Sequence, residues 1–426
     1  MDMRIREFTD FLDSAHSVYH VAAGLIWELE TAGYVALAEN ESWDLVPGGK
    51  YYVTRGGSVL AFRIPVQVPT GFMLSACHSD RPGFKVKENG ELTGKYNRLS
   101  VEGYGGMIMS AWLDRPLSIA GRVLVEVDGQ IESRLVDIDR DLLLIPNVAI
   151  HQNRAVNDGY KWNPAVDMLP LLGGEDTKGQ LQQLLEAEAG GKILGQDLYL
   201  YLRQKAAIWG LNQEYISAAA LDDLECVWGC AQGFLASTES TAVPVLCVFD
   251  NEEVGSVSLQ GAGSNLLESV LGRICRQMQW DMDQLLAQSF MVSADNAHAV
   301  HPNHPEYADA ANAPVMNKGI VIKFNANLRY NTDGVSAAIM RKVCQIAHVP
   351  VQTYSNRADM PGGSTLGAIS IGHVSVPTVD IGLAQLAMHS CYETAGVQDV
   401  LYLLEAMTAY YSCALEVQAD GIYNIR

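Results

Sequence analysis

Four apolar runs of this chain each lead toward a histidine or a carboxylate. Each run is short and strand-like, and the four are spread over most of the sequence. The runs are 72–77, before His78 and Asp80; 243–249, before Glu252 and Glu253; 290–294, before Asp295; and 376–381, before a loop that carries His389. In open α/β sheets, ligands bind beyond the carboxyl ends of the strands. Packing alone does not explain four strands with such ends, so the pattern predicts a functional site at one sheet edge.

Taken singly, each of these residues also has a structural interpretation. His78 and Asp80 resemble a surface or capping pair. The adjacent Glu252 and Glu253 resemble a solvated turn or the acidic first turn of a helix. Asp295 suits a helix N-cap, and a lone histidine is often a hydrogen-bonded core residue. Only their joint occurrence indicates a metal or acid–base site.

Asp222 is a further candidate, at the start of a predicted helix. Leu224, Val227 and Trp228 lie on the apolar face of that helix. Acids in a first helical turn complement the helix dipole. A structural role and a ligand role are therefore both open for Asp222.

A glycine-rich stretch at 362–367 is the remaining local motif. Such a stretch can present backbone N–H groups to an anion or a carbonyl oxygen, and the alternative is a glycine turn without a ligand. The sequence contains no His-Glu-x-x-His helix, P-loop, dinucleotide loop or Gly-x-Ser-x-Gly elbow.

The order of helix-like and strand-like segments along the chain predicts an α/β protein with an insertion. The first forty residues are typical of helix, and Gly56-Gly57 lies between two strand-like runs. Asp128-Gly129 marks a second hairpin, and 181–191 is typical of a short acidic helix. We expect a mixed sheet flanked by helices, formed by 1–92 and 213–426, with an inserted β-rich domain at 93–212.

Composition excludes several classes of protein. The net charge of −20 disfavours nucleic-acid binding, because so acidic a chain repels phosphate backbones. No apolar run approaches the roughly 20 residues of a membrane span, and the N-terminus shows no signal-peptide pattern. The eight cysteines lack CxxC spacing, which favours reduced thiols and a cytoplasmic location.

Seven segments together resemble a known family. They are 76–87, 104–106 with 112–117, 145–154, 249–256, 293–303 and 388–390. Over nearly the whole chain, the sequence is similar to the aspartyl aminopeptidase family of zinc metallopeptidases. The resemblance implies a zinc-peptidase-like fold and the release of N-terminal residues, acidic ones among them, from peptides.

The resemblance also implies a two-zinc site, with manganese or cobalt as substitutes. Its expected ligands are His78, Asp222 and Asp295 for one ion, and Asp222, Glu253 and His389 for the other. Asp80 is expected to accept the second ring N–H of His78. Glu252 is expected to be the general base.

Other expectations follow from the same resemblance. His151 would reach an active site, that of a neighbouring subunit included, or serve as a metal ligand. The insertion would mediate dimerisation, and dimers would build a tetrahedral dodecamer. A pocket for an acidic side chain needs a cation, for which the candidates are Lys323, Arg329 and Arg357. The alternatives are a two-metal amidohydrolase acting on non-peptide amides and a catalytically inactive assembly protein.

Overall fold

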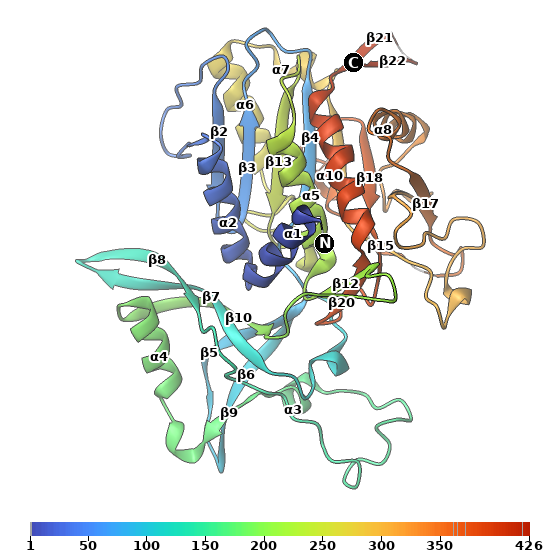
Figure 1. Ribbon diagram of the computed structural model, residues 1–426. Helices are drawn as coiled ribbons and strands as arrows, with labels where there is room; N and C mark the ends of the chain where they lie inside the picture. Colours follow the sequence, from blue (N-terminus) through green and yellow to red (C-terminus); the bar gives the residue numbers. More distant parts are fainter. Residues whose placement is uncertain (1, 361, 364, 371, 420) are drawn as a thin grey trace.

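The computed structural model describes residues 2–360, 362–363, 365–370, 372–419 and 421–426. It has two parts, which lie one above the other in Figure 1. The upper part is a nine-stranded sheet with helices, and the lower part is a six-stranded sheet with one longer helix. Within these ranges, none of the helices has the length and apolar character needed to cross a bilayer.

The nine-stranded sheet, called the central sheet below, contains both parallel and antiparallel strand pairs. Its order is β1 (Val35–Ala36), β2 (Lys50–Arg55), β3 (Ser58–Arg63), β13 (Val243–Phe249), β4 (Phe72–His78), β14 (Phe290–Ala294), β18 (Thr378–Gly382), β16 (Ile320–Phe324) and β17 (Val351–Ser355). The four central strands, β13, β4, β14 and β18, are parallel to one another, whereas β3 and β16 pair antiparallel with them. Every residue of the four is buried, as expected for central strands covered on both faces. The mixed α/β sheet predicted from the sequence is confirmed.

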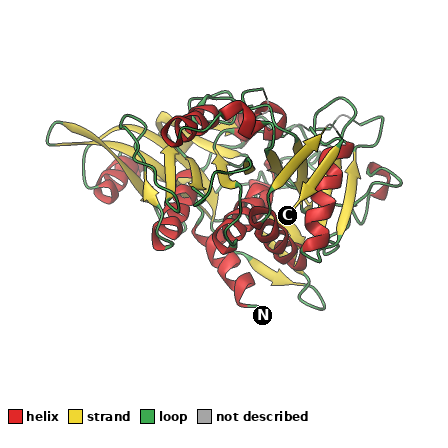
Figure 2. Cartoon of the chain, turned by 90° about the horizontal axis from the view of Figure 1, so that it is seen from above, coloured by secondary structure: helices red, strands yellow, loops and turns green. Residues whose placement is uncertain are grey.

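Helices cover both faces of this sheet (Figure 2), and each face has its own apolar core. One face carries α1 (Met3–Ser14), α2 (Val18–Thr31), α5 (Leu221–Ala236), α8 (Gly334–Ile346) and α10 (Val397–Ser412). The other face carries α6 (Leu266–Met278) and α7 (Met282–Leu286). The helix expected over the first forty residues is two helices ending at Thr31, followed by β1.

The six-stranded sheet is antiparallel and has its own core. Its order is β8 (Gln130–Asp137), β7 (Leu117–Val127), β10 (Ile193–Leu202), β5 (Gly83–Leu92), β6 (Tyr96–Tyr104) and β9 (Leu171–Gly174). The hairpin predicted at Asp128-Gly129 joins β7 to β8, and α4 (Gln180–Ala189) ends at a left-handed Gly190. The strands of this sheet lie in sequence between β4 and β13 of the nine-stranded sheet, so we call it the inserted sheet and its region the inserted part. Because β5 pairs within it, the inserted sheet begins before residue 93, where the insertion was predicted to start.

A third, five-stranded sheet lies at the junction of the two parts. Its order is β11 (Ala207–Trp209), β12 (Tyr215–Ala218), β20 (Glu393–Gly396), β19 (Ala384–Leu386) and β15 (Ala297–His298). Strand β12 leads into α5, and the β19–β20 connection contains His389. This small sheet therefore positions two segments beside the edge of the central sheet.

Candidate metal centre

The predicted site residues come from five places at one edge of the central sheet. His78 is the last residue of β4, Asp295 directly follows β14, Asp222 lies in the first turn of α5, Glu252 and Glu253 form a single turn after β13, and His389 lies between β19 and β20. Because β13, β4 and β14 are parallel neighbours, their carboxyl ends meet. The sheet topology thus brings together residues far apart in sequence.

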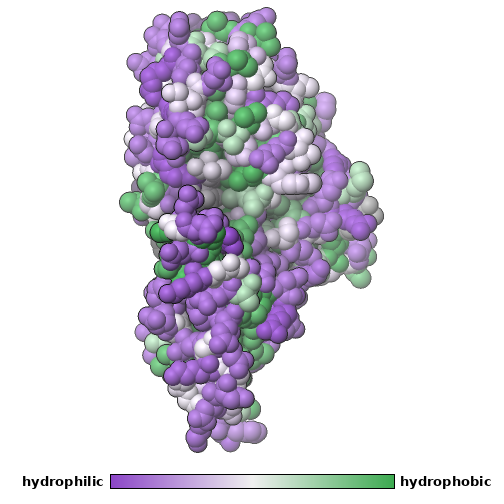
Figure 3. All heavy atoms as spheres, turned by 90° about the vertical axis from the view of Figure 1, so that its left-hand side faces the viewer, coloured by the Kyte–Doolittle hydropathy of each residue, from purple (hydrophilic) through white to green (hydrophobic). Residues whose placement is uncertain are grey.

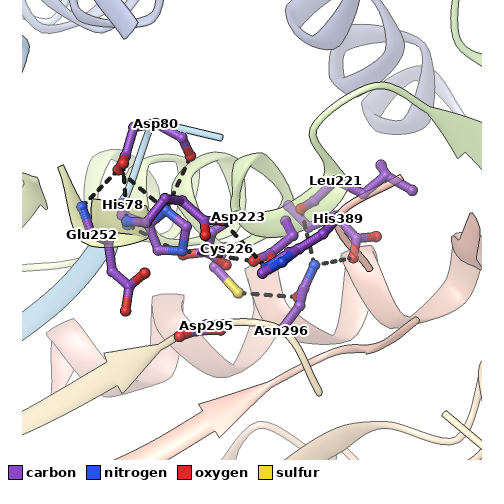
Figure 4. Close-up of polar contacts among 12 residues, drawn as sticks. His78, Asp80, Leu221, Asp223, Cys226, Glu252, Asp295, Asn296 and His389 are labelled. Carbon is purple, nitrogen blue, oxygen red and sulfur yellow. Dashed lines mark hydrogen bonds and ion pairs between the residues drawn. The ribbon is translucent and has the colours of Figure 1, made fainter. Parts of the chain in front are cut away.

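Three groups of side chains in this cluster have the spacing of metal ligands. One contains His78, Asp222, Asp223 and Asp295, a second contains Asp222, Glu253 and His389, and a third contains His78, Glu252 and Glu253; within each group the candidate ligand atoms lie within 4.8 Å of one another. Asp222 belongs to the first two groups: its Oδ1 lies 3.6 Å from His78 Nε2, and its Oδ2 lies 3.3 Å from His389 Nε2. Figure 4 shows the histidines, Asp223 and Asp295 in this arrangement. The predicted ligands are therefore adjacent, and Asp222 is central.

The backbone at the start of α5 accounts for the direction of Asp222. Asp222 and Asp223 have non-helical backbone angles, and neither carboxylate caps the helix. Asp223, which sequence reasoning missed, accepts the backbone N–H of His78 at 3.2 Å and is fully buried. The adjacency of the two acids was the only signal in the sequence that could have indicated it.

Asp80 makes more contacts than the predicted one. The nearest acceptor for His78 Nδ1 is the backbone carbonyl of Asp80, at 3.1 Å, whereas the Asp80 carboxylate lies 3.5 Å away. The two carboxylate oxygens instead accept the backbone N–H groups of Glu252 and Glu253, at 3.0 and 3.1 Å. The carbonyl is thus the closer partner of His78, and the carboxylate, 3.5 Å from the same nitrogen, also fixes the turn that carries the two glutamates. The predicted role of the carboxylate in orienting His78 stays a prediction.

The six-stranded sheet contributes to the same site. Tyr104, at the end of β6, donates its hydroxyl to Asp80 Oδ2 at 2.7 Å. The carbonyl of Gly106 lies 2.6 Å from His389 Nδ1, and the N–H of Ile108 bonds the His389 carbonyl at 2.9 Å. An acceptor on Nδ1 leaves Nε2 of His389 free to face the carboxylates. Sequence reasoning gave residues 104–106 no role at the site.

Several carboxylates are buried close together in this cluster, which is electrostatically unfavourable without cations. Burial raises the pKa of Glu252 to about 7 and also raises the pKa of Glu253, and neighbouring carboxylates add to both shifts. Oδ1 of Asp222 and Asp223 and Oε1 of Glu253 are buried without a hydrogen-bond partner. Unpaired buried oxygens are costly, and imidazole with carboxylate is a donor set that suits zinc. The residues present therefore fit divalent cations.

A cavity of about 510 Å³ opens on the cluster. Its lining also includes His298, Lys323, Tyr330, Gly363 and Thr365. Residues of the predicted glycine-rich loop thus reach the cavity, although Ser364 of that loop lies outside the described residues. Of the three candidate cations, only Lys323 lines it; Arg357 pairs with Asp359 at 2.6 Å, and Arg329 is exposed.

His151 lies elsewhere in this chain. It is exposed in a loop of the inserted part, between β8 and α3 (Pro164–Asp167). Among the residues that the structure describes, it belongs neither to the metal-ligand groups nor to the lining of this cavity. Its predicted role at an active site stays a prediction.

Comparisons with known proteins agree with this geometry. The model of the family described as Aminopeptidase I zinc metalloprotease (M18) matches residues 11–411. A protein of Clostridium novyi (strain NT), named "Probable M18 family aminopeptidase 2", is 40% identical over 423 residues, which are 95% of this chain and 98% of that one. A protein of the same name from Pseudomonas aeruginosa (strain UCBPP-PA14) is 41% identical over 418 residues, 95% of this chain and 96% of that one.

Solved structures give the same result. The Ape4 and Nbr1 complex contains a chain with a TM-score of 0.93 and 34% identity, covering 96% of this chain and 85% of that one. A yeast mApe1 dodecamer has a TM-score of 0.85 and 27% identity, covering 96% of both chains. A sheet edge that collects histidines and carboxylates around one cavity defines a metal-dependent hydrolase. The chain belongs to the M18 family of zinc metalloproteases, and it is an aminopeptidase.

Proposed function

We propose that this aminopeptidase removes N-terminal acidic residues from peptides with two zinc ions. His78, Asp222 and Asp295 would hold one ion, and Asp222, Glu253 and His389 the other, with manganese or cobalt as substitutes. The observation that carries this proposal is the pair of ligand groups that share Asp222. The buried carboxylate oxygens without hydrogen-bond partners support it.

Glu252 is the proposed general base. When bound, the zinc ions lower the pKa of a water molecule and polarise the scissile carbonyl. Glu252 takes the proton from the attacking water and later delivers it to the leaving amine. Its backbone is fixed by Asp80 on the same turn as Glu253, so the base keeps a constant position relative to a ligand. Positioning of this kind contributes to catalysis because the reacting groups are already oriented.

Lys323 is the proposed anchor for an acidic substrate side chain. It is buried, donates to the backbone carbonyl of Asp295 at 2.7 Å, and lies 3.5 Å from the Asp295 carboxylate. Its ammonium also lies 5.0 Å from the Tyr330 ring centroid. Lys323 and Tyr330 line the cavity beside the ligands, and a buried ammonium there favours a carboxylate partner. The glycine-rich loop is proposed to help stabilise the oxyanion.

Assembly forms the last part of the proposal. The inserted part would mediate dimerisation, and the dimers would build a tetrahedral dodecamer in the cytoplasm. In this assembly His151 would contribute to an active site, as a substrate-binding group or a metal ligand. The dodecameric state named for the yeast neighbour supports this, as do the exposed Val148 and Ile150 beside His151. All eight cysteines are free, which suits a reducing compartment.

A panel of aminoacyl nitroanilides tests the activity and the preference together. With zinc, manganese or cobalt, we expect a higher kcat/KM for aspartyl and glutamyl substrates than for leucyl or lysyl ones. Lys323→Met should lower kcat/KM for the acidic substrates by about 10–100-fold more than for the leucyl substrate, the scale of one buried charge-assisted hydrogen bond. Because Lys323 also contacts the proposed ligand Asp295, a loss shared by all substrates reports on the zinc site and not on the preference. A wild-type enzyme that prefers the leucyl substrate would contradict the acidic preference. Absence of turnover with every metal would contradict the peptidase mechanism itself.

A further inference from the structure

Glu393 connects two of the proposed metal ligands through their backbones. It is the first residue of β20 and is 1% exposed. One carboxylate oxygen, Oε2, accepts the backbone N–H of Asp222 at 2.9 Å, and the other, Oε1, accepts the N–H of His389 at 2.6 Å. These two ligands come from separate segments, the start of α5 and the β19–β20 connection. A single buried carboxylate therefore fixes their separation.

The backbone of His389 needs such a contact. Its φ of +67° lies in the left-handed region, which is uncommon and unfavourable for a residue with a side chain. The conformation persists only where surrounding contacts hold it. Here the N–H bonds Glu393, the carbonyl accepts the N–H of Ile108, and the ring bonds the carbonyl of Gly106.

We infer that Glu393 is a positioning residue, a backbone clamp that sets the distance between Asp222 and His389 for the metal they share. Among the described residues, Glu393 belongs to no metal-ligand group and does not line the cavity that opens on the ligands, so it acts through Asp222 and His389. Both of its oxygens are used as acceptors, so a glutamine of the same shape would keep one bond and turn an N–H donor toward the other N–H. This inference rests on the proposed two-zinc site and adds to it the group that fixes the positions of two of its ligands.

Asp399 provides a matched control. It is also fully buried, and its two oxygens accept the backbone N–H groups of Asn317 and Gly319, at 2.5 and 2.8 Å. Neither of those residues is a proposed ligand. Glu393→Gln and Asp399→Asn thus remove the same kind of buried clamp, one beside the metal site and one away from it.

Zinc binding to the purified full-length chain separates the two roles. In Glu393→Gln, we expect the dissociation constant of the weaker zinc, measured by competition with a chromogenic chelator, to rise by about 10–100-fold, the usual effect of losing an outer contact to a metal ligand. Asp399→Asn should leave that constant close to the wild-type value, although both variants lower the thermal unfolding midpoint of the zinc-free chain. His389→Ala provides the reference for loss of one zinc per chain. An unchanged zinc affinity in Glu393→Gln, or an equal loss in Asp399→Asn, would overturn the inference.

A second measurement needs neither variant nor metal. In the zinc-free wild-type chain, hydrogen–deuterium exchange read at single residues should find the amides of Asp222 and His389 protected. Rapid exchange at both amides would overturn the clamp. This readout does not depend on zinc, so it tests the clamp alone. The proposed function is tested separately, and a wild-type chain that binds fewer than two zinc ions would contradict it.

Discussion

The central sheet and the inserted sheet contribute to the site in different ways. In the central sheet, four neighbouring strands are parallel, so their carboxyl ends deliver chemical groups to one edge. In the inserted sheet, every pairing is antiparallel, and successive strands end at opposite edges. Its contribution is a short segment, 104–108, that touches Asp80 and His389. The parallel edge supplies His78, Asp295 and the two glutamates, and the inserted sheet helps to position the site residues.

The outer surface differs in character from the buried site. Figure 3 shows a face on which hydrophilic residues dominate both parts and hydrophobic residues form small, separate groups. The chain carries a net charge of −20, yet the aspartates of the metal centre are buried and its two glutamates are partly buried. The acidity that disfavours nucleic-acid binding therefore says little about the site, where burial and geometry decide the chemistry.

The largest effect is expected at the parallel edge. Glu252→Gln should lower kcat by about 10³-fold, because general acid–base catalysis contributes on the order of 10²–10⁴-fold. The amide has nearly the same shape but cannot take a proton. Zinc content, measured by atomic absorption, should stay near the wild-type value. Loss of zinc in this variant would mean that Glu252 is a ligand, which its closeness to His78 and Glu253 also allows.

The adjacent glutamate gives the control. Glu253→Gln lies on the same turn, and its Oε1 is 3.5 Å from His389 Nε2. We expect this variant to lose zinc as well as activity. Equal zinc content in the two variants would contradict the assignment of one glutamate as base and the other as ligand.

The strands and site residues at the parallel edge could largely be predicted from the sequence. Most of the contacts that hold those residues in place could not. The run at 243–249 is entirely buried, so its apolar sequence and the acids that follow were enough to predict a strand and a site. Glu393 lies in a four-residue strand, too short for any periodicity. The contact of Gly106 with His389 joins residues 283 positions apart through a backbone carbonyl that no side-chain pattern reveals.

A smaller effect is expected where the inserted sheet touches the site. Tyr104→Phe removes the hydrogen bond to Asp80 and leaves the ring in place, beside Tyr199. Since a hydrogen bond to a charged group contributes about 1.5–3 kcal/mol, we expect kcat to fall by about 10-fold with zinc content unchanged. The cause would be a looser turn at Glu252 and Glu253, whose N–H groups Asp80 holds.

Tyr199→Phe is the matched control for this prediction. Its ring lies 5.6 Å from that of Tyr104, on β10 of the same sheet, and no described hydrogen bond links it to Asp80. We expect wild-type kcat in this variant. Equal losses in the two variants would mean that packing of the inserted sheet, and not the bond to Asp80, affects catalysis.

The two parts also meet at a pair of histidines, His16 in the connection between α1 and α2 and His20 on α2. His16 Nδ1 lies 2.7 Å from Asp137 of β8, and the His16 ring stacks on Tyr201 of β10 at 4.0 Å. His20 bonds Ser17 through its Nδ1 at 2.8 Å. Burial lowers the pKa of His20 to about 4; Asp137 opposes this shift, and His16 adds to it. His20 is therefore neutral in the folded protein across the physiological range.

The smallest expected effect is a pH dependence of stability from His20. Its folded pKa of about 4 is lower than the unfolded value of about 6.5. The neutral ring therefore contributes its full stability above pH 6.5, and this contribution is lost as the pH falls toward 4. After allowance for partial exposure, we expect wild type to lose about 1–2 kcal/mol more than His20→Gln between pH 7 and pH 5. Urea midpoints at the two pH values measure this difference, and His373→Gln, at an exposed histidine, should keep the wild-type pH dependence. If His20→Gln keeps it as well, the junction between the two parts titrates through other groups.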